Sequence, residues 1–357
     1  MAYTTIDDPS AHHQTKIYTG NGTDGRALTF DGNSDMQPDW LWVKNRNNTG
    51  PYSGHIFDST RGANKSLFPD DVAAELTNSA YGYLGAFQSD GFTVTSGSSG
   101  DERVNNDNDL YVMWGWKANG GTTSTNDDGN IDTTVQANTT AGFSIVTWTG
   151  ANSTATLGHG LGAVPEMIIS KPRDSGQEWG VYHQHVGNDD YLHLNETAAE
   201  QDNAVYWNDT TPTSTVWSVG NAGPTNRNTS AMLAYVFAPI QGYSKFGSYT
   251  GNANAEGPFV YTGFKPAWVV IKNIDATANW HMYDNKRDAT NVVETALQAN
   301  TSNAEFTTSN KLDFVSNGFK IRAGNQVSTN HDGVNYIYMA FAESPFVSSK
   351  GVPTTAR

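Results

Sequence analysis

Histidine and carboxylate side chains are the residues whose types and spacing come closest to a chemical site. His183 and His185 stand two positions apart, and His193 follows a little further along the chain. Side chains two apart on a strand face the same side, so a third histidine could complete a zinc site. Such a pair more often bonds neighbouring carbonyl groups, and we therefore predict no metal site and no cofactor.

Carboxylates cluster in four short stretches, at 101–102, 107–109, 127–128 and 189–190. None of these stretches has the glycine and terminal glutamate of a calcium loop, although calcium binding by a loop stays open. A glycosidase needs two carboxylates opposed across a cleft, and the spacing opposes none of these. We predict solvated loop tips and no catalytic residues.

One charged motif occurs twice. Asp58 is followed by Arg61 and Asp284 by Arg287, each time directly after an aromatic residue. We predict an ion pair within each motif that locks a turn, because the two positions are close enough along the chain to meet.

The elements that position these residues repeat three times. A strand motif begins at Pro38, Pro165 and Pro266, and apolar closing strands follow at 111–116, 232–237 and 336–341. Short apolar runs separated by Gly, Asn, Asp and Pro are typical of β-sandwiches of about a hundred residues. The fold class predicted is all-β, with three consecutive related β-sandwich-like units, jelly-roll or lectin-like, and few helices.

Composition places the boundaries between these parts. Residues 119–140 contain no aromatic residue and are rich in polar residues, which is typical of a linker. The ends of the chain lack repeat landmarks and are expected to grip partners. The predicted parts are an N-terminal anchoring arm, β unit 1, a polar linker, β unit 2, β unit 3 and a C-terminal tail, at 1–14, 15–118, 119–140, 141–238, 239–346 and 347–357.

The stretch PDWLWVKNR at 38–46 alternates Trp40 and Trp42 with Leu41 and Val43. Alternate residues of a strand face opposite sides, so both faces are expected to be buried. The third unit repeats the pattern as PAWVVIKN, whereas the second replaces the aromatics in PEMIISKPR. We therefore predict a buried strand and not an aromatic binding platform.

Charge and cysteine content exclude several classes of function. The chain has 36 acidic and 21 basic residues, for a net charge of −15, which disfavours nucleic acid and anionic lipid. It has no cysteine, which suits a protein assembled in a reducing cytoplasm. The opening residues lack the pattern of a signal peptide, and no stretch is apolar enough to insert into a membrane.

Several phrases of the sequence carry a family resemblance, including GFSIVTWTG, HGLGAVPEMIISKPR, FVYTGFKPAWVVIKN and MAFAESPF. With them the chain resembles a repeat-bearing virion protein of phages that infect marine bacteria and cyanobacteria. The resemblance implies a structural protein of the particle, grouped with tail fibres or other appendages and assembled in the bacterial cytoplasm. It supplies no catalytic residues.

The function expected is therefore a tail fibre or tail-associated appendage that contacts the host surface, through a glycan or a protein, without catalysis. The candidate ligand-binding residues are aromatics in loops: Tyr52, Tyr81, Tyr83, Tyr191 and Trp207. Two alternatives remain open, a capsid decoration or tail adaptor and a polysaccharide depolymerase. Other virion proteins are the expected partners, and a homo-oligomer, with a trimer favoured, is the expected assembly.

Overall fold

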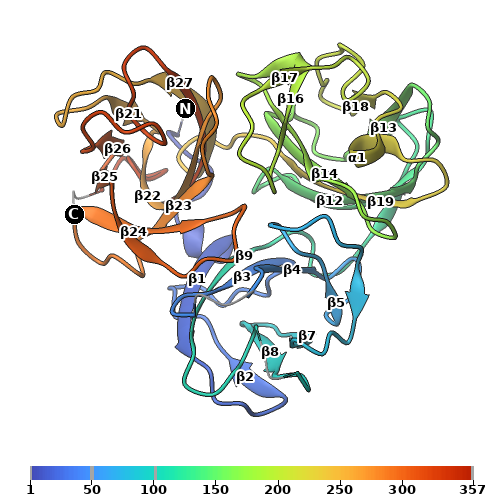
Figure 1. Cartoon of the computed structure of the whole chain (residues 1–357), viewed down its shortest axis with the longest axis horizontal. Coiled ribbons are helices and arrows are strands. Elements are labelled where there is room, and N and C mark those ends of the chain that lie inside the picture. Colours follow the sequence, from blue (N-terminus) through green and yellow to red (C-terminus); the bar gives the residue numbers. More distant parts are fainter. Residues whose placement is uncertain (1, 49–51, 100–102, 355–357) are drawn as a thin grey trace.

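The computed structural model describes residues 2–48, 52–99 and 103–354. The chain is almost entirely β-structure, divided into three units that surround a common centre, one at each corner of a triangle (Figure 1). Within each unit, four consecutively paired strands face the centre, and further strands cover their other face; the four strands form a separate sheet in unit 1 and part of an eight-stranded sheet in units 2 and 3. The all-β fold and the three related units agree with the prediction.

Unit 1 follows the short 3-10 helix η1 (Pro9–Ala11) and has the inner order β1-β9-β3-β4 and the outer order β2-β8-β7. Its strands are β1 (His13–Thr19), β2 (Arg26–Leu28), β3 (Trp40–Asn45), β4 (His55–Asp58), β5 (Lys65–Ser66), β6 (Leu76–Thr77), β7 (Tyr83–Phe87), β8 (Phe92–Thr95) and β9 (Leu110–Trp116).

Unit 2 has the inner order β12-β19-β14-β15 and pairs β13 with β18 in its outer layer. Its elements are β10 (Ser124–Asn126), β11 (Thr133–Asn138), β12 (Phe143–Thr149), β13 (Ala155–Gly158), β14 (Met167–Pro172), β15 (Gly180–His183), β16 (Gly187–His193), β17 (Gln201–Asp202), β18 (Val216–Val219), α1 (Gly223–Asn226) and β19 (Ala231–Phe237).

In unit 3 one sheet has the order β20-β27-β22-β23-β24-β25-β26-β21, with β20-β27-β22-β23 as its inner part and β25-β26-β21 as its outer part. Its strands are β20 (Ser244–Thr250), β21 (Phe259–Tyr261), β22 (Phe264–Asn273), β23 (His281–Asp284), β24 (Val293–Gln298), β25 (Phe306–Val315), β26 (Gly318–Ile321) and β27 (Asn335–Pro345).

The prediction of a polar linker at 119–140 is wrong. Strands β10 and β11 form there and extend the inner sheet of unit 2 beyond β12. Val135 and Gln136 are buried. The segment has few apolar residues because its strands lie at the edge of the sheet, where backbone pairing and hydrogen bonds of polar side chains such as Gln136 hold them.

The inner faces of the three sheets share one hydrophobic core. Trp40 of unit 1 is fully buried, and its ring lies 4.3 Å from that of Trp116 and 4.7 Å from that of Tyr235 in unit 2. Trp116 in turn lies 5.5 Å from Phe341 of unit 3. Leu41, on the opposite face of β3, packs in the separate core of unit 1. Both faces of the tryptophan-rich strand are therefore buried, as predicted, one of them against the neighbouring units.

Buried lysines join the units in a closed ring. Lys171 of unit 2 donates to the carbonyl of Val72 in unit 1 (2.9 Å), and Lys272 of unit 3 donates to that of Thr197 in unit 2 (3.1 Å). Lys44 of unit 1 completes the ring by donating to a carbonyl of unit 3. Burial lowers the pKa of all three lysines to about 8.

The repeated Asp-x-x-Arg motifs form the predicted ion pairs, and each also reaches a neighbouring unit. Asp58 pairs with Arg61 and accepts a hydrogen bond from the Tyr235 hydroxyl of unit 2 (2.8 Å). Asp284 pairs with Arg287 (2.5 Å) and accepts from the Trp114 indole of unit 1 (3.2 Å).

His183 occupies the corresponding position of unit 2. It faces Met167 in the strand pairing, just as Asp58 faces Trp40 and Asp284 faces Trp268. Its Nε2 lies 3.3 Å from the Tyr338 carbonyl of unit 3. Burial lowers the pKa of His183 to about 3, so this position is uncharged at neutral pH, whereas the equivalent position at each of the other two junctions carries an ion pair.

Three glutamates also occupy equivalent positions at the junctions. The backbone N–H groups of Glu75, Glu200 and Glu305 donate to the carbonyls of Arg173, Ile274 and Arg46 in the adjacent units (2.7, 2.9 and 2.9 Å). The carboxylates of Glu75 and Glu305 then bind these arginines, whereas Ile274 offers Glu200 no charge.

Replacing Trp40 tests the shared core. Trp40→Ala should lower the free energy of unfolding by about 3–5 kcal/mol, because the cavity would lie where three units meet. The measurement is urea denaturation followed by fluorescence. Val327→Ala is the control, because this valine is 48% exposed and its loss should change stability by no more than about 0.5 kcal/mol. Equal effects of the two substitutions would contradict a shared core.

The glutamates give a prediction about pH. Burial first, then the charges of Asp190, Asp275 and Asp189, raise the pKa of Glu200 from 4.5 to about 7. The folded chain therefore keeps this proton where the unfolded chain has lost it, and stability falls as pH rises from about 4.5 to 7. Glu200→Gln should be more stable than the wild type at pH 8, by less than about 1 kcal/mol because the site is half-exposed. At pH 4 the wild type and Glu200→Gln should have equal free energies of unfolding.

Glu75→Gln is the matched control for this prediction. Burial opposes ionisation of Glu75, but Arg173 and Arg61 outweigh it and lower the pKa of the carboxyl. Its stabilisation is present above about pH 4.5 and is lost as pH falls through the lowered pKa. At pH 8, Glu75→Gln should cost about 1.5–3 kcal/mol of unfolding free energy. If both substitutions changed the free energy of unfolding at pH 8 in the same direction, the opposite pKa shifts of Glu75 and Glu200 would be contradicted.

Candidate functional site

The three junctions between units have equivalent walls. Each wall begins with the residue after the proline of the repeated strand motif, which is Asp39, Glu166 or Ala267. The carbonyls of these residues accept hydrogen bonds of 2.9 Å from the N–H groups of Ser59, Gln184 and Asn285 respectively. The three positions can therefore be compared directly.

The chain itself fills the junction between units 1 and 2. Asp39 accepts hydrogen bonds from the N–H groups of Ala118 (2.8 Å) and Gly120 (2.9 Å), which lead into the β10–β11 segment. Burial raises the pKa of Asp39, although these bonds oppose the shift. Gln136 of β11 donates to the hydroxyl groups of Ser59 (3.0 Å) and Thr60 (2.7 Å) on the same wall.

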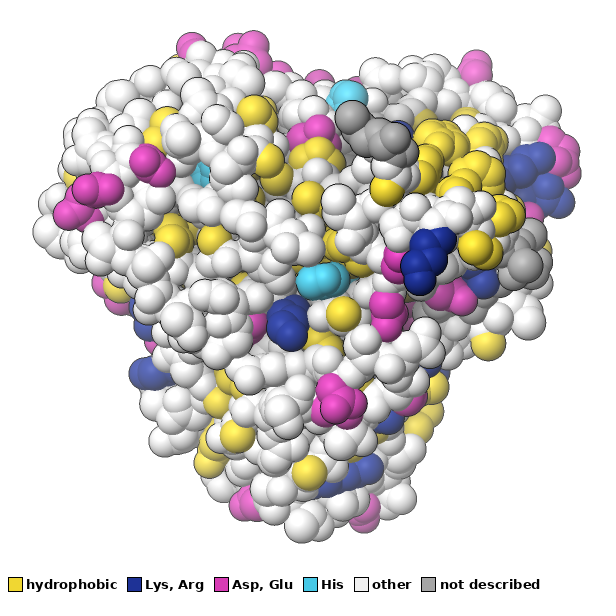
Figure 2. Space-filling model, turned by 180° about the vertical axis from the view of Figure 1, so that it is seen from behind, with side chains coloured by type: hydrophobic (Ala, Val, Ile, Leu, Met, Phe, Trp, Pro, Cys, Tyr) yellow, Lys and Arg dark blue, Asp and Glu magenta, His cyan; other side chains and the backbone are white. Residues whose placement is uncertain are grey.

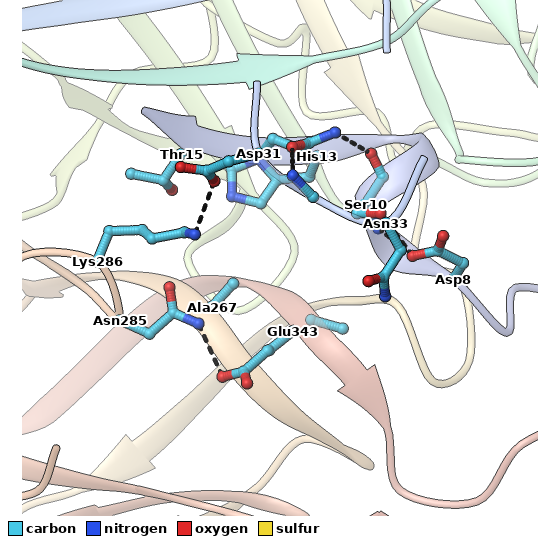
Figure 3. A pocket seen from close by; sticks show the side chains of 13 residues that line it. Asp8, Ser10, His13, Thr15, Asp31, Asn33, Ala267, Asn285, Lys286 and Glu343 are labelled. Atoms are coloured by element: carbon cyan, nitrogen blue, oxygen red, sulfur yellow. Dashed lines mark hydrogen bonds and ion pairs between the residues drawn. The ribbon is translucent and has the colours of Figure 1, made fainter. Parts of the chain in front are cut away.

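The junction between units 3 and 1 holds a cavity of about 180 Å³ with paired charges (Figure 3). Lys286 of unit 3 bonds Asp31 of unit 1 across it (2.8 Å), and Asn285 donates to Glu343 (2.7 Å). His13 lies between the rings of Trp116 and Phe341, and burial lowers its pKa to about 3. The Lys286–Asp31 ion pair therefore bridges this junction beside the cavity.

The junction between units 2 and 3 is open. A cavity of about 460 Å³ lies between Glu166, Gln184 and His185 of unit 2 and the first residues of β20. Burial raises the pKa of Glu166 to about 7, in spite of a hydrogen bond from Gln184 and the charge of Lys245. Burial also lowers the pKa values of Lys245 and His185. Burial thus disfavours the charged form of all three of these groups around the cavity.

This cavity continues along β20 into a second of about 400 Å³, and His185, Lys245 and Tyr261 line both. There the side of unit 3 is exposed between the edge strand of its inner sheet and β21. Phe259 is 50% exposed and Tyr261 is 46% exposed. We call the surface formed by β20, Phe259 and Tyr261 the open flank. Figure 2 shows hydrophobic side chains gathered over unit 3 beside lysine and arginine side chains.

Residues near the chain start border the open flank. The Tyr3 hydroxyl bonds that of Tyr261 (3.0 Å) and donates to the Gly263 carbonyl (2.8 Å). Thr4 donates to the Gln241 carbonyl (2.8 Å), and Asp7 accepts from the N–H of Ser349 in the predicted C-terminal tail (2.6 Å). The predicted arm and tail thus contact unit 3 and each other, and residues 355–357 lie outside the described residues.

None of the five aromatic residues predicted as ligand-binding candidates lines the two cavities of the open flank. Trp207 is only 1% exposed, because its ring packs against Tyr182 in the core of unit 2, so its predicted exposure is wrong. Tyr191 stacks on Tyr206 at 3.6 Å and donates to Gln201. Tyr52, Tyr81 and Tyr83 are half-buried in unit 1.

The histidines that suggested zinc do not converge. His183 is buried against unit 3, whereas His193 bonds Glu196 (2.8 Å) and Tyr206 (2.9 Å). Within the described ranges, no group of three potential metal ligands is close enough to hold an ion. No helix in this part of the chain is long and apolar enough to span a membrane.

The open flank was missed because its signal in the sequence is small. Phe259, Val260 and Tyr261 alternate around a buried valine. The corresponding strand of unit 2, β13, has Thr156 and Gly158 around the buried Leu157. Aromatic residues on the outward side of a short edge strand were the available signal.

Comparison with known proteins places the whole molecule in one group. Searches of curated proteins and of solved structures found no match. A family model described as a domain of unknown function (DUF7483) matches residues 8–345, which include all three units and the junctions between them. The chain belongs to this DUF7483 family.

Proposed function

We propose that the chain is a non-enzymatic structural protein of a phage particle, a subunit of a tail-associated appendage that is assembled in the bacterial cytoplasm. The open flank of unit 3 attaches it to a neighbouring protein. The observation that carries this proposal is the exposure of Phe259 and Tyr261 beside an unpaired strand edge, in a chain that buries most of its aromatic side chains. Exposed apolar groups of this kind mark interaction surfaces.

The chemistry of the open junction favours binding over cleavage. Among the described residues that line its two cavities, Glu166 contributes the one carboxylate. Hydrolysis of a glycosidic bond ordinarily uses two carboxylates on either side of that bond. The depolymerase alternative therefore has less support than attachment. The resemblance to virion proteins supports the particle as the location.

Direct contact with a host saccharide is the second candidate. It is favoured by the aromatic rings of Phe259 and Tyr261, which lie next to the polar groups of Gln184, His185 and Lys245. Aromatic faces and hydrogen-bonding groups are both suited to sugar rings. A host saccharide and a neighbouring protein would compete for the same flank, so one experiment can separate them.

Location on the particle tests the main proposal. A gold-labelled binder raised against residues 141–346 should label the tail of intact particles in electron micrographs. Labels spread over the head would contradict an appendage and support a capsid decoration. An absence of label under conditions that label the purified chain would contradict a virion protein altogether.

A saccharide array tests the second candidate. If the flank binds host sugar, the purified chain should bind at least one bacterial surface saccharide. Tyr261→Ala should then weaken binding about tenfold, a loss of about 1.4 kcal/mol. Val327→Ala, an exposed position outside the residues that line the flank, is the control. Binding to no saccharide, or equal binding by both variants, would exclude this candidate and leave a protein partner.

A further inference from the structure

The edge of β20 has backbone groups that face the open junction. Within the described residues, β20 pairs with β27 on one side and with no strand on the other, where an isolated bridge joins its first residue, Ser244, to Ile240. The carbonyl of Phe246 points away from β27, because it accepts a hydrogen bond from Nε2 of Gln184 in unit 2 (2.8 Å). In an antiparallel ladder this direction recurs every second residue, so the N–H and C=O of Ser248 also point outward.

Unit 2 shows how the equivalent edge is covered by a further strand. Its equivalent strand, β12, is covered by β11, where Gln136 lies opposite Ile145 and Thr134 opposite Thr147. Ile145 pairs with Tyr235 on its other side, at the level where Phe246 pairs with Met339. Phe246 and Ser248 therefore correspond to residues that have a strand partner in unit 2.

The β10–β11 segment also covers part of the outer layer of unit 2. The N–H of Asn130 donates to the Thr156 hydroxyl (2.9 Å), and Thr133 donates to the Gly158 carbonyl (2.8 Å). These contacts hide the edge of β13. The counterpart of β13 in unit 3 is β21, where Phe259 and Tyr261 are exposed. The apolar patch thus lies where unit 2 carries a covering segment.

The walls of the two junctions also correspond. In the closed junction Gln136 contacts Ser59 and Thr60, beside the carboxylate of Asp39. In the open junction the residues at these positions are Gln184, His185 and Glu166. Side chains alternate along a strand, so Val135 packs in the core of unit 2 while Gln136 faces the wall of unit 1.

We infer that the open flank of unit 3 binds an extended segment of a different protein of the particle, which adds to β20 as an antiparallel strand. The segment places an aliphatic residue over Phe259 and Tyr261 and an amide side chain against Glu166 and Gln184. Strand addition of this kind gains affinity from main-chain hydrogen bonds and specificity from alternate side chains. The inference rests on the proposed function for the identity of the partner.

The occupant is a different protein because the covering segment of this chain is already in place in unit 2. The chain contains one β10–β11 segment, and that segment is held in unit 2 with Gln136 fully buried. The other uncovered inner edge, β1, lies at the junction that the Asp31 and Lys286 pair bridges. β1 therefore serves as an internal control.

The test uses the full chain and a synthetic peptide with the sequence of residues 119–140, followed by amide hydrogen exchange in NMR. Saturating peptide should slow exchange of the Phe246 and Ser248 N–H groups at least tenfold and leave Ile17 of β1 unchanged. Replacing Gln136 of the peptide with alanine should weaken its binding to the chain several-fold. Absence of protection at Phe246 and Ser248 would overturn the inference.

Variants of the chain separate strand addition from simple adhesion. Ser248→Pro removes the outward N–H and should abolish protection of Phe246, whereas Ser248→Ala should retain it. Tryptophan fluorescence checks that the proline variant is folded. Tyr261→Ala, which leaves the backbone intact, should weaken peptide binding at least threefold. Equal peptide binding by Ser248→Pro and Ser248→Ala would contradict strand addition.

The remaining outcomes distinguish this inference from the proposed function. Light scattering that shows association of the chain with itself, abolished by Tyr261→Ala, would make the occupant a second copy and overturn the inference. A labelled tail without peptide binding would leave the proposed function standing and the inference wrong. Peptide binding by a chain that labels no part of the particle would support strand addition and contradict the proposed function.

Discussion

The burial of three sheet faces against one another is the interaction on which the rest of the structure depends. Trp40, Trp116 and Phe341 come from two units, and Tyr235 adds the third to the same core. Aromatic side chains bury large areas, so each inner sheet loses much of its apolar contact if a neighbour is removed. One chain thus supplies a threefold arrangement that separate subunits often form. The predicted trimer of chains stays a prediction.

The polar contacts of the ring follow from that core. Each lysine tether and each glutamate N–H bonds a backbone carbonyl of the next unit, so these donors keep a partner when the junctions bury them. The junction between units 2 and 3 differs in its charges, with His183 in place of an aspartate and Ile274 in place of an arginine. It is also the junction with the open cavity, which places the candidate surface where the ring has the fewest ionic contacts.

Much of the fold could be predicted from repeats and alternation, but the relation between units could not. Alternation indicated that Trp40 and Leu41 face opposite buried sides, yet it carries no information about which unit covers them. The segment 119–140 was predicted to be a linker because its sequence has no alternating apolar residues. Hydrogen bonds of Gln136, Asn130 and Thr133 hold it in place, and such bonds leave no apolar pattern in a sequence. Trp207 was predicted to be exposed because it lies outside any alternating run of apolar residues, but its ring is buried in the core of unit 2. The open flank becomes evident only when β21 and β13 are compared in three dimensions.

Differential scanning calorimetry tests the shared core most directly, because it compares the measured unfolding enthalpy with the enthalpy inferred from the sharpness of the transition. If the three units share one core, they should unfold as one cooperative body, with a single transition and a ratio of the two enthalpies of about 1. Units that fold independently would give a ratio of about 3, or separate transitions, and would contradict the account.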